Sequence, residues 1–215
     1  MGITERRRRE KEQRQRLIQD AALEVFLQKG FHSATIEDIA NQAELSTATI
    51  YLYFKNKYEL YASLNLLYLE FLRDRIEDVH SDDRLSIPEK MIGFKDAMYN
   101  TFKKYPVLLK IIFHVQLYDI LPDLDPNLLN KLNRVGRSLM NMMGATYEEG
   151  AAQGLFKPGH GMTHADILWS LFSGLVVWEG AKRQIASDKD FLKSTLDRAF
   201  DIICWGIQAD GQHRQ

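Results

Sequence analysis

Apolar residues recur along this chain at intervals of three and four, which places them on one face of an α-helix. The first stretch forms two adjacent rows, made of Leu17, Ala21 and Val25 and of Ile18, Ala22 and Phe26. Gly30 follows at a position where a helix can end in a left-handed residue. Alternating β-branched runs, which indicate strands, are missing. The pattern therefore predicts an all-α protein of about nine helices, with one ambiguity over 107–120, where a continuous apolar run could form a buried strand.

Two short helices separated by a tight turn are predicted next. Thr35 can cap the first, with Asp38 completing a capping box, and this helix should end near Ala43. Ser46 is the next capping candidate and opens a helix through about Phe54. The two helices and the turn between them have the spacing of a helix-turn-helix.

A long helix is predicted from about Asn56 to Val79, with a buried face made of Leu60, Leu64, Leu67 and Phe71. Later helix starts are marked by Pro88, by Pro106, by Asp125 with Pro126, by Thr163 with Asp166, and by Ser187 with Asp190. Segment 81–84 is polar, and segment 154–162 contains a proline and three glycines, so both are predicted to be loops.

The second short helix would expose small hydroxyl and phenol groups with no acid among them, at Thr47, Ala48, Thr49, Tyr51 and Tyr53. The major groove of DNA accepts such a surface, because threonine can reach base edges or phosphates and alanine can contact a thymine methyl group. Lys57, at the start of the long helix, can reach the same phosphate backbone. The pattern therefore favours a DNA-binding element.

Many residues from Ala21 to Leu60 agree with a known pattern at fixed spacing: Ala21-Ala22, Phe26, Gly30-Phe31, Ala34-Thr35-Ile36-Glu37-Asp38-Ile39-Ala40, Ala43-Glu44-Leu45-Ser46 and Thr49-Ile50-Tyr51-Leu52-Tyr53-Phe54-Lys55-Asn56-Lys57-Tyr58-Glu59-Leu60. This stretch closely resembles the DNA-binding domain of the tetracycline-repressor (TetR) family. The resemblance implies a three-helix DNA-binding domain over 1–55 and a larger helical ligand-binding and dimerisation domain over 56–215. It also implies a homodimer, a palindromic double-stranded DNA operator, and usually repression that a small molecule relieves.

Carried over position by position, the resemblance implies DNA contacts at Thr35, Ser46, Thr49, Tyr51, Tyr53 and Lys57, most of them to phosphate. Positions 47 to 49 would lie nearest the bases. The small core would consist of Phe26, Ile39, Leu45, Ile50 and Phe54. Two positions depart from the family pattern, which usually has glycine where this chain has Glu44 and often has glycine where it has Ala48. If the turn keeps the family geometry, Glu44 has a positive φ.

The whole chain carries a net charge of −1, so any nucleic-acid surface must be local. Its first twenty residues hold seven cations and four anions, a net charge of +3. A run of this kind is usually a solvated face. Beside a helix-turn-helix we favour a flexible basic arm, in which Arg6, Arg7, Arg8 and Arg9 enter a minor groove or lie along phosphates.

The rest of the chain is rich in aromatic residues and methionine, which are more often core than pocket at helical spacing. Together they predict a partly apolar cavity for a small effector, lined by Tyr68, Phe94, Met98, Phe113, His114, Met143, Tyr147 and Phe172. The alternative for His114 is a core histidine with satisfied hydrogen bonds. A dimer interface resembling a four-helix bundle is predicted at Leu192, Leu196, Ala199 and Ile203, with close approach at Ser173, Gly174 and Val177.

Other functional classes are disfavoured. Cys204 is the single cysteine, so no intrachain disulfide can form, and the residue is expected to be a buried hydrophobe. No signal peptide and no apolar run near ~20 residues is visible, so we expect a cytoplasmic protein without membrane contact. No catalytic constellation, phosphate loop or metal-ligand spacing is visible, His160 and His164 included, so we expect no enzyme, cofactor or metal. The alternative function is a helical ligand-binding or interaction protein with a vestigial DNA-binding domain.

Overall fold

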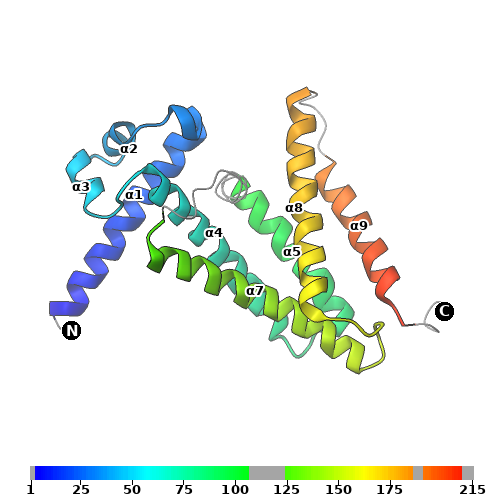
Figure 1. Cartoon of the computed structure of the whole chain (residues 1–215). Helices are drawn as coiled ribbons and strands as arrows, with labels where there is room; N and C mark the ends of the chain where they lie inside the picture. The colour runs from blue at the N-terminus through cyan, green and yellow to red at the C-terminus, as the bar shows by residue number, and fades with distance from the viewer. Residues whose placement is uncertain (1–2, 107–123, 186–190, 210–215) are drawn as a thin grey trace. The chain divides into compact units, whose positions relative to one another are not determined.

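The computed structural model describes residues 3–106, 124–185 and 191–209, which belong to two compact units (Figure 1). The first unit comprises Met1–Tyr68 with Val107–Leu132, and the second comprises Leu69–Pro106 with Asn133–Gln215. The described residues form eight helices, and the one β-type feature among them is an antiparallel bridge between Phe156 and Gln208. The prediction of an all-α protein is confirmed. The expected helix starts at Pro106 and Ser187 and the strand alternative over 107–120 fall at the edge of or outside the described residues.

The first helix, α1 (Ile3–Ser33), includes the basic segment that was expected to be a flexible arm. The segment is helical from Ile3 onward, so that expectation is wrong. No glycine or proline interrupts it before Gly30, and three ion pairs join residues four apart, between Arg6 and Glu10, Arg8 and Glu12, and Arg9 and Glu5. Gly30 interrupts the helical geometry with φ 75° and ψ 164°, a conformation open essentially to glycine alone.

Two short helices follow, α2 (Ile36–Gln42) and α3 (Thr47–Tyr51). The predicted caps are present: the Thr35 hydroxyl accepts from the Asp38 N–H at 3.1 Å, and the Ser46 hydroxyl accepts from the Thr49 N–H at 3.1 Å. Helix α3 ends at Tyr51 and not near Phe54, so the predicted end was too late. The chain leaves α3 early because Phe54 turns into the core, where it is 5% exposed.

The turn between α2 and α3 is a Schellman motif with an unusual residue at its centre. The Leu45 N–H donates to the Ala40 carbonyl at 2.8 Å, and the Glu44 N–H donates to the Asn41 carbonyl at 3.2 Å. Glu44 has φ 55° and is the one non-glycine residue with positive φ in the described part of the chain. The expected positive φ at Glu44 is confirmed. A glycine usually fills this position because a Cβ disfavours the left-handed conformation.

The long helix α4 (Lys57–His80) starts and ends within one residue of the prediction. Its fully buried row runs every fourth residue through Leu60, Leu64, Tyr68, Leu72 and Ile76, each at most 1% exposed. Leu67 and Phe71, which were expected on this face, are half-buried. Helix α4 begins in the first unit and continues into the second, as does α7 (Pro126–Ala152). The expected functional boundary at 55/56 falls just before α4, and its functional meaning stays a prediction.

The second unit is completed by α5 (Ile87–Lys104), α8 (Gly161–Ile185) and α9 (Leu192–Ile207), with α9 packed on both α5 and α8 (Figure 1). Pro88 lies in the first turn of α5, as predicted. Helix α8 begins two residues before the expected cap at Thr163. It does so because the Gly161 N–H is bound by a Glu148 carboxylate oxygen at 2.8 Å, and because Gly161 lies so close to Gly144 that neither has room for a Cβ.

Lys57, the first residue of α4, joins α4 to the end of α1. Its ammonium donates to the carbonyls of Phe31 and Ala34 at 2.7 and 2.8 Å, and to that of His32 at 3.3 Å. The same ammonium lies 4.6 Å from the centre of the Phe31 ring. Burial lowers the pKa of Lys57 from its usual value, while the three carbonyl oxygens favour the charged form. The ammonium therefore satisfies two carbonyls of the last turn of α1, which lack intrahelical partners, and the carbonyl of Ala34 just after the helix.

Replacing Glu44 with glycine should raise the free energy of unfolding by about 1 kcal/mol, because glycine adopts the left-handed conformation without a Cβ clash. Removal of a carboxylate beside α3 should also tighten binding to DNA. Gly154 provides the converse control, since it has φ 73° at the end of α7 with open space around its Cβ position. Gly154→Glu should destabilise the protein by a similar amount. Chemical denaturation measures both, and a less stable Glu44→Gly protein would contradict the strain argument.

Lys57→Met keeps the aliphatic stem on Phe31 and removes the ammonium. We expect it to lower the free energy of unfolding by about 1–2 kcal/mol, because three carbonyls are left without a charged donor. Lys55→Met is the matched control: Lys55 is exposed and its ion pair with Asp125 at 3.2 Å should contribute under about 1 kcal/mol. Suppose instead that Lys57→Met is as stable as the parent, and that the slope of log DNA affinity against log salt falls by the amount expected for about one phosphate contact. Lys57 would then be a phosphate ligand, and its carbonyl contacts would be incidental.

Candidate nucleic-acid interface

The surface of α3 presents the residues that the sequence singled out. Thr47 and Ala48 are exposed, and Tyr51 is 53% exposed. Thr49 is half-buried, and both its N–H and its hydroxyl bond the Ser46 hydroxyl, at 3.1 and 2.9 Å. Thr47 and Ala48 therefore have the greatest freedom to contact a ligand, while Ser46 and Thr49 hold the start of the helix.

The interior of the first unit supports this surface. Four of the five expected core residues, Phe26, Ile39, Ile50 and Phe54, are at most 5% exposed, whereas Leu45 is half-buried. An aromatic cluster joins α1 to α4, with the Tyr61 ring 4.3 Å from the Phe31 ring and 5.0 Å from the Phe26 ring. Burial raises the pKa of Tyr61 to about 12, so its phenol stays neutral.

The six cations of α1 between Arg6 and Arg14 fall into two groups. Arg6, Arg8 and Arg9 share their charge with Glu10, Glu12 and Glu5. In contrast, Arg7, Lys11 and Arg14 are exposed and have no ion-pair partner among the described residues. Their spacing of four and then three residues places them on one face of the helix. We call these three residues the cationic stripe.

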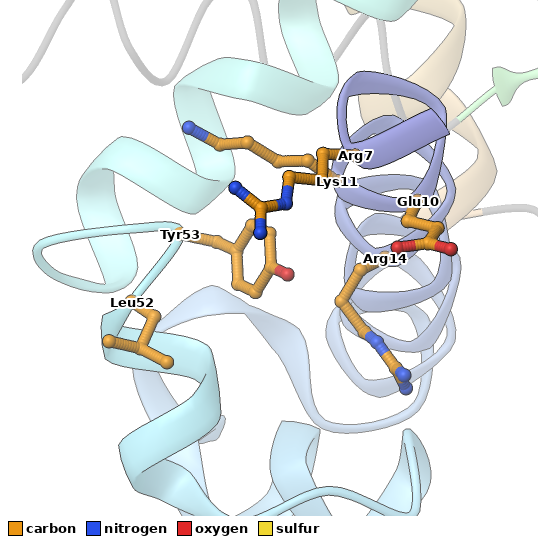
Figure 2. Close-up of a pocket in the computed structure, with 6 residues that line it drawn as sticks. All are labelled: Arg7, Glu10, Lys11, Arg14, Leu52 and Tyr53. Carbon is orange, nitrogen blue, oxygen red and sulfur yellow. The ribbon is translucent and has the colours of Figure 1, made fainter. Parts of the chain in front are cut away.

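The cationic stripe faces the turn that follows α3 across an open hollow (Figure 2). The hollow, of about 490 Å³, is lined by the stripe together with Glu10, Leu52 and Tyr53. Figure 2 shows the Tyr53 ring pointing from the turn toward α1, with Arg7 and Lys11 extending toward the ring's side of the helix and Glu10 pointing away. A phenol, two guanidinium groups and an ammonium around one hollow are suited to a polyanion.

Sequence reasoning missed part of this surface. Lys11 and Arg14 were counted only as members of a charge run, although their spacing from Arg7 could have identified the stripe. Leu52 was missed altogether, and it is 80% exposed beside Tyr53. No signal in one sequence separates Leu52 from a core residue.

Thr35 lies at the start of α2, where it is exposed but engaged in the capping box. The Lys29 ammonium and the Thr35 backbone and hydroxyl groups lower the pKa of Asp38, which keeps that cap charged. Lys57 has the carbonyl partners described above in place of the expected phosphate. A role for either residue at DNA stays a prediction.

The residues predicted to line an effector cavity are deeply buried where the structure describes them. Tyr68 in the first unit and Phe94, Met98, Met143, Tyr147 and Phe172 in the second are each at most 1% exposed, and Phe113 and His114 lie outside the described residues. The Tyr68 hydroxyl has no hydrogen-bond partner in the described part of the chain. The Tyr147 hydroxyl donates to the Lys157 carbonyl at 2.6 Å, and its ring stacks on His164. Burial fits both a packed core and an enclosed cavity, so the prediction stays open.

The predicted dimer stripe requires correction. Leu192 and Leu196 are 2% and 1% exposed in the single chain, because this side of α9 packs on α5 and α8. Ser173 is also buried, at 4%. Ala199 and Ile203 are half-buried, while Gly174 and Val177 are exposed. The exposed apolar side chains of these two helices are Ile167, Val177, Trp178 and Ile185 on α8, and Ile202 and Trp205 on α9.

Cys204 is half-buried, and burial raises the pKa of its thiol, which disfavours the nucleophilic thiolate. None of the helices described is both long and apolar enough to cross a lipid bilayer. The described ranges also contain no group of three or more His, Cys, Asp or Glu side chains placed to hold a metal ion.

Comparison with known proteins identifies the family of this chain. A family model described as bacterial regulatory proteins, tetR family, matches residues 18–64. The fatty acid metabolism regulator protein of Bacillus subtilis is 30% identical over 147 residues, which cover 66% of this chain and 70% of that protein. The TetR-family regulator PfmR of Thermus thermophilus has a similar fold, with a TM-score of 0.70 and 19% identity over 88% of this chain and 97% of PfmR. FadR of Bacillus subtilis, solved with stearoyl-CoA, has a TM-score of 0.64 and 22% identity over 89% of this chain and 98% of FadR. The chain belongs to the TetR family of bacterial transcriptional regulators.

Proposed function

We propose that this regulator binds a palindromic operator as a homodimer and represses transcription until a small, mostly apolar effector releases it. The observation that carries the DNA-binding part is the cationic stripe, which faces Tyr53 beside the exposed surface of α3. Both lie in the first unit, so one compact element presents charge for phosphates next to side chains for bases. A vestigial domain would not be expected to keep three cations without ion-pair partners on one described face.

Within this interface, Thr47, Ala48 and Thr49 lie nearest the bases, and Ser46, Tyr51 and Tyr53 contact phosphates. The cationic stripe adds phosphate contacts from α1. We keep Arg6, Arg8 and Arg9 in the interface with a smaller role, because each already shares its charge with a glutamate. In this assignment 1–55 is the DNA-binding domain, and 56–215 binds the effector and the second subunit.

The dimer follows from the reading of two half-sites, since one recognition helix reads too few bases for useful specificity. We propose that the exposed apolar side chains of α8 and α9 form the interface as a four-helix bundle with their symmetry mates. Gly174 and Val177 remain in this interface, and Ala199 and Ile203 lie at its edge. The six large side chains there, between 46% and 90% exposed, would be an unusual apolar surface for a monomer.

The effector is proposed to be mostly apolar because the second unit buries so many aromatic and methionine side chains. Two similar proteins point to one class of compound: a relative named for fatty acid metabolism and a fold neighbour solved with stearoyl-CoA. A molecule with an acyl chain is therefore the first effector to test.

The cationic stripe can be tested with charge-matched variants. Replacing Arg7, Lys11 and Arg14 together with glutamine should weaken binding to any duplex. The plot of log affinity against log salt should become shallower by about 0.9 for each phosphate that the variant no longer neutralises. The triple replacement of Arg6, Arg8 and Arg9 removes the same charge from the same helix and should have a smaller effect. Glutamine is a good helix former, so α1 should persist in both. Binding to a mixed-sequence duplex at several salt concentrations measures the slopes.

Equal slopes for the two triple variants would show that α1 acts as diffuse charge, and the stripe assignment would be wrong. Slopes unchanged in both variants would place the DNA contacts elsewhere.

The interface can be tested by placing a charge on it. Trp178 is 62% exposed, and Trp178→Glu should convert a dimer at micromolar concentration into a monomer. Operator affinity should then fall by about a hundredfold or more, because the second half-site is no longer linked. Ile92, 50% exposed on α5, is the matched control, and Ile92→Glu should remain dimeric. Sedimentation measures the assembly, and a parent protein that sediments as a monomer would refute the proposal.

A further inference from the structure

The second unit contains an open groove between α4 and α5, and the residues that line it have no role in the function proposed above. Its volume is about 410 Å³, within the usual range for small-molecule sites. The lining residues are Phe71, Arg75, Asp78 and Val79 from α4, and Gly93, Asp96, Ala97, Asn100, Thr101 and Lys104 from α5. None of them belongs to the DNA surface, the dimer surface or the predicted effector cavity.

The groove follows α5 from Gly93 to Lys104. At one end the helices approach so closely that a Cβ on Gly93 would lie 2.7 Å from Val79 Cγ1. At the other end the Lys104 ammonium lies 4.4 Å from the centre of the Phe71 ring. Between Gly93 and Lys104 helix α5 rises about 16 Å. This shape suits an extended chain better than a compact ring system.

The charges along the groove are unevenly compensated. Arg75 and Asp78 pair at 3.3 Å, and Asp96 pairs with Lys95 at 3.4 Å. Both Lys104 and Arg75 lie over the Phe71 ring, at 4.4 and 5.5 Å from its centre. Arg75 has Asp78 as its partner, whereas Lys104 has no carboxylate partner among the described residues. The end at Phe71 therefore carries a positive charge that nothing described neutralises, and it favours an anionic group.

Thr101 supplies a second observation at the same end. Its side chain is 0% exposed, and its hydroxyl has no hydrogen-bond partner in the described structure. A buried hydroxyl without a partner is destabilising relative to a bonded one. Thr101 and Lys104 are three residues apart on α5, so they lie on the same face. Because Thr101 is fully buried, an acceptor can bond its hydroxyl and the Lys104 ammonium together only when the side chains that cover the hydroxyl move aside. Ala97 and Val79 continue the groove as an apolar wall.

We propose that this groove binds an extended organic carboxylate, with its carboxylate at Thr101 and Lys104 and its apolar chain along Ala97 and Val79. The inference rests on the proposed function only where it treats the bound molecule as an effector. Binding to the groove is measured without DNA, so it can succeed or fail independently of the proposed function.

Decanoate is the probe, and decanol, with the same chain and no charge, is its control. Calorimetric titration should show decanoate binding with decanol at least about tenfold weaker. Lys104→Gln should weaken decanoate about threefold to fivefold, and less so at high salt, because the ammonium is exposed. Lys103→Gln removes an equal charge from the neighbouring exposed residue outside the groove and should leave decanoate binding unchanged.

Two further variants separate a binding role from a structural one. Thr101→Val removes the unpartnered hydroxyl at constant shape, so it should weaken decanoate about fivefold and leave the free protein equally or more stable. Ala97→Leu fills the groove and should abolish decanoate binding. Equal binding of decanoate and decanol, or decanoate binding unchanged by both Thr101→Val and Ala97→Leu, would refute the site. Binding to a mixed-sequence duplex should be the same in all these variants without decanoate. A variant that lost duplex binding would be misfolded, and its thermal stability would show this separately.

Discussion

The first unit depends on the junction where α1 ends and α4 begins. A helix end leaves carbonyl groups without intrahelical partners, and here the Lys57 ammonium bonds two of them, together with the Ala34 carbonyl just after the helix. The aromatic rings of Phe31 and Tyr61 pack beside this polar contact, 4.3 Å apart. Gly30 makes the junction possible because it adopts a conformation that other residues avoid. These contacts fix the end of α1 against the start of α4.

The distribution of charge on α1 follows from helix geometry. Among the six cations between Arg6 and Arg14, Arg6, Arg8 and Arg9 pair with glutamates four residues away, and Arg7, Lys11 and Arg14 lie on another face. In a flexible arm the paired and the unpaired cations would not lie on separate faces. In a helix the same composition separates into a solvated face and a face available to a polyanion. The turn at Glu44 is likewise set by backbone geometry, since the Schellman hydrogen bonds hold a glutamate in a conformation that glycine prefers.

Local signals predicted the helices of the first unit well. Capping residues such as Thr35 and Ser46 act within three residues of themselves, so their effect is visible in the chain. The end of α3 was misplaced because it depends on the burial of Phe54 by residues distant in sequence. The cap of α8 was misplaced for the same reason, since Glu148 on α7 binds the Gly161 N–H.

The sequence alone determined that this protein is helical and that it has a helix-turn-helix near its N-terminus, because periodicity and capping are local properties. That Glu44 occupies a position suited to glycine followed from the resemblance to the TetR family. Only the tertiary structure decided which side chains remain exposed or unpaired and can therefore bind a partner. Leu192 and Leu196 lie on an apolar stripe that could equally have faced a second subunit, and contacts with α5 and α8 bury them within one chain. The ammonium of Lys57 was taken by carbonyls of α1, while Arg7, Lys11 and Arg14 remained without ion pairs in the described structure. Burial and pairing depend on which elements meet in space, and no spacing within one helix specifies that.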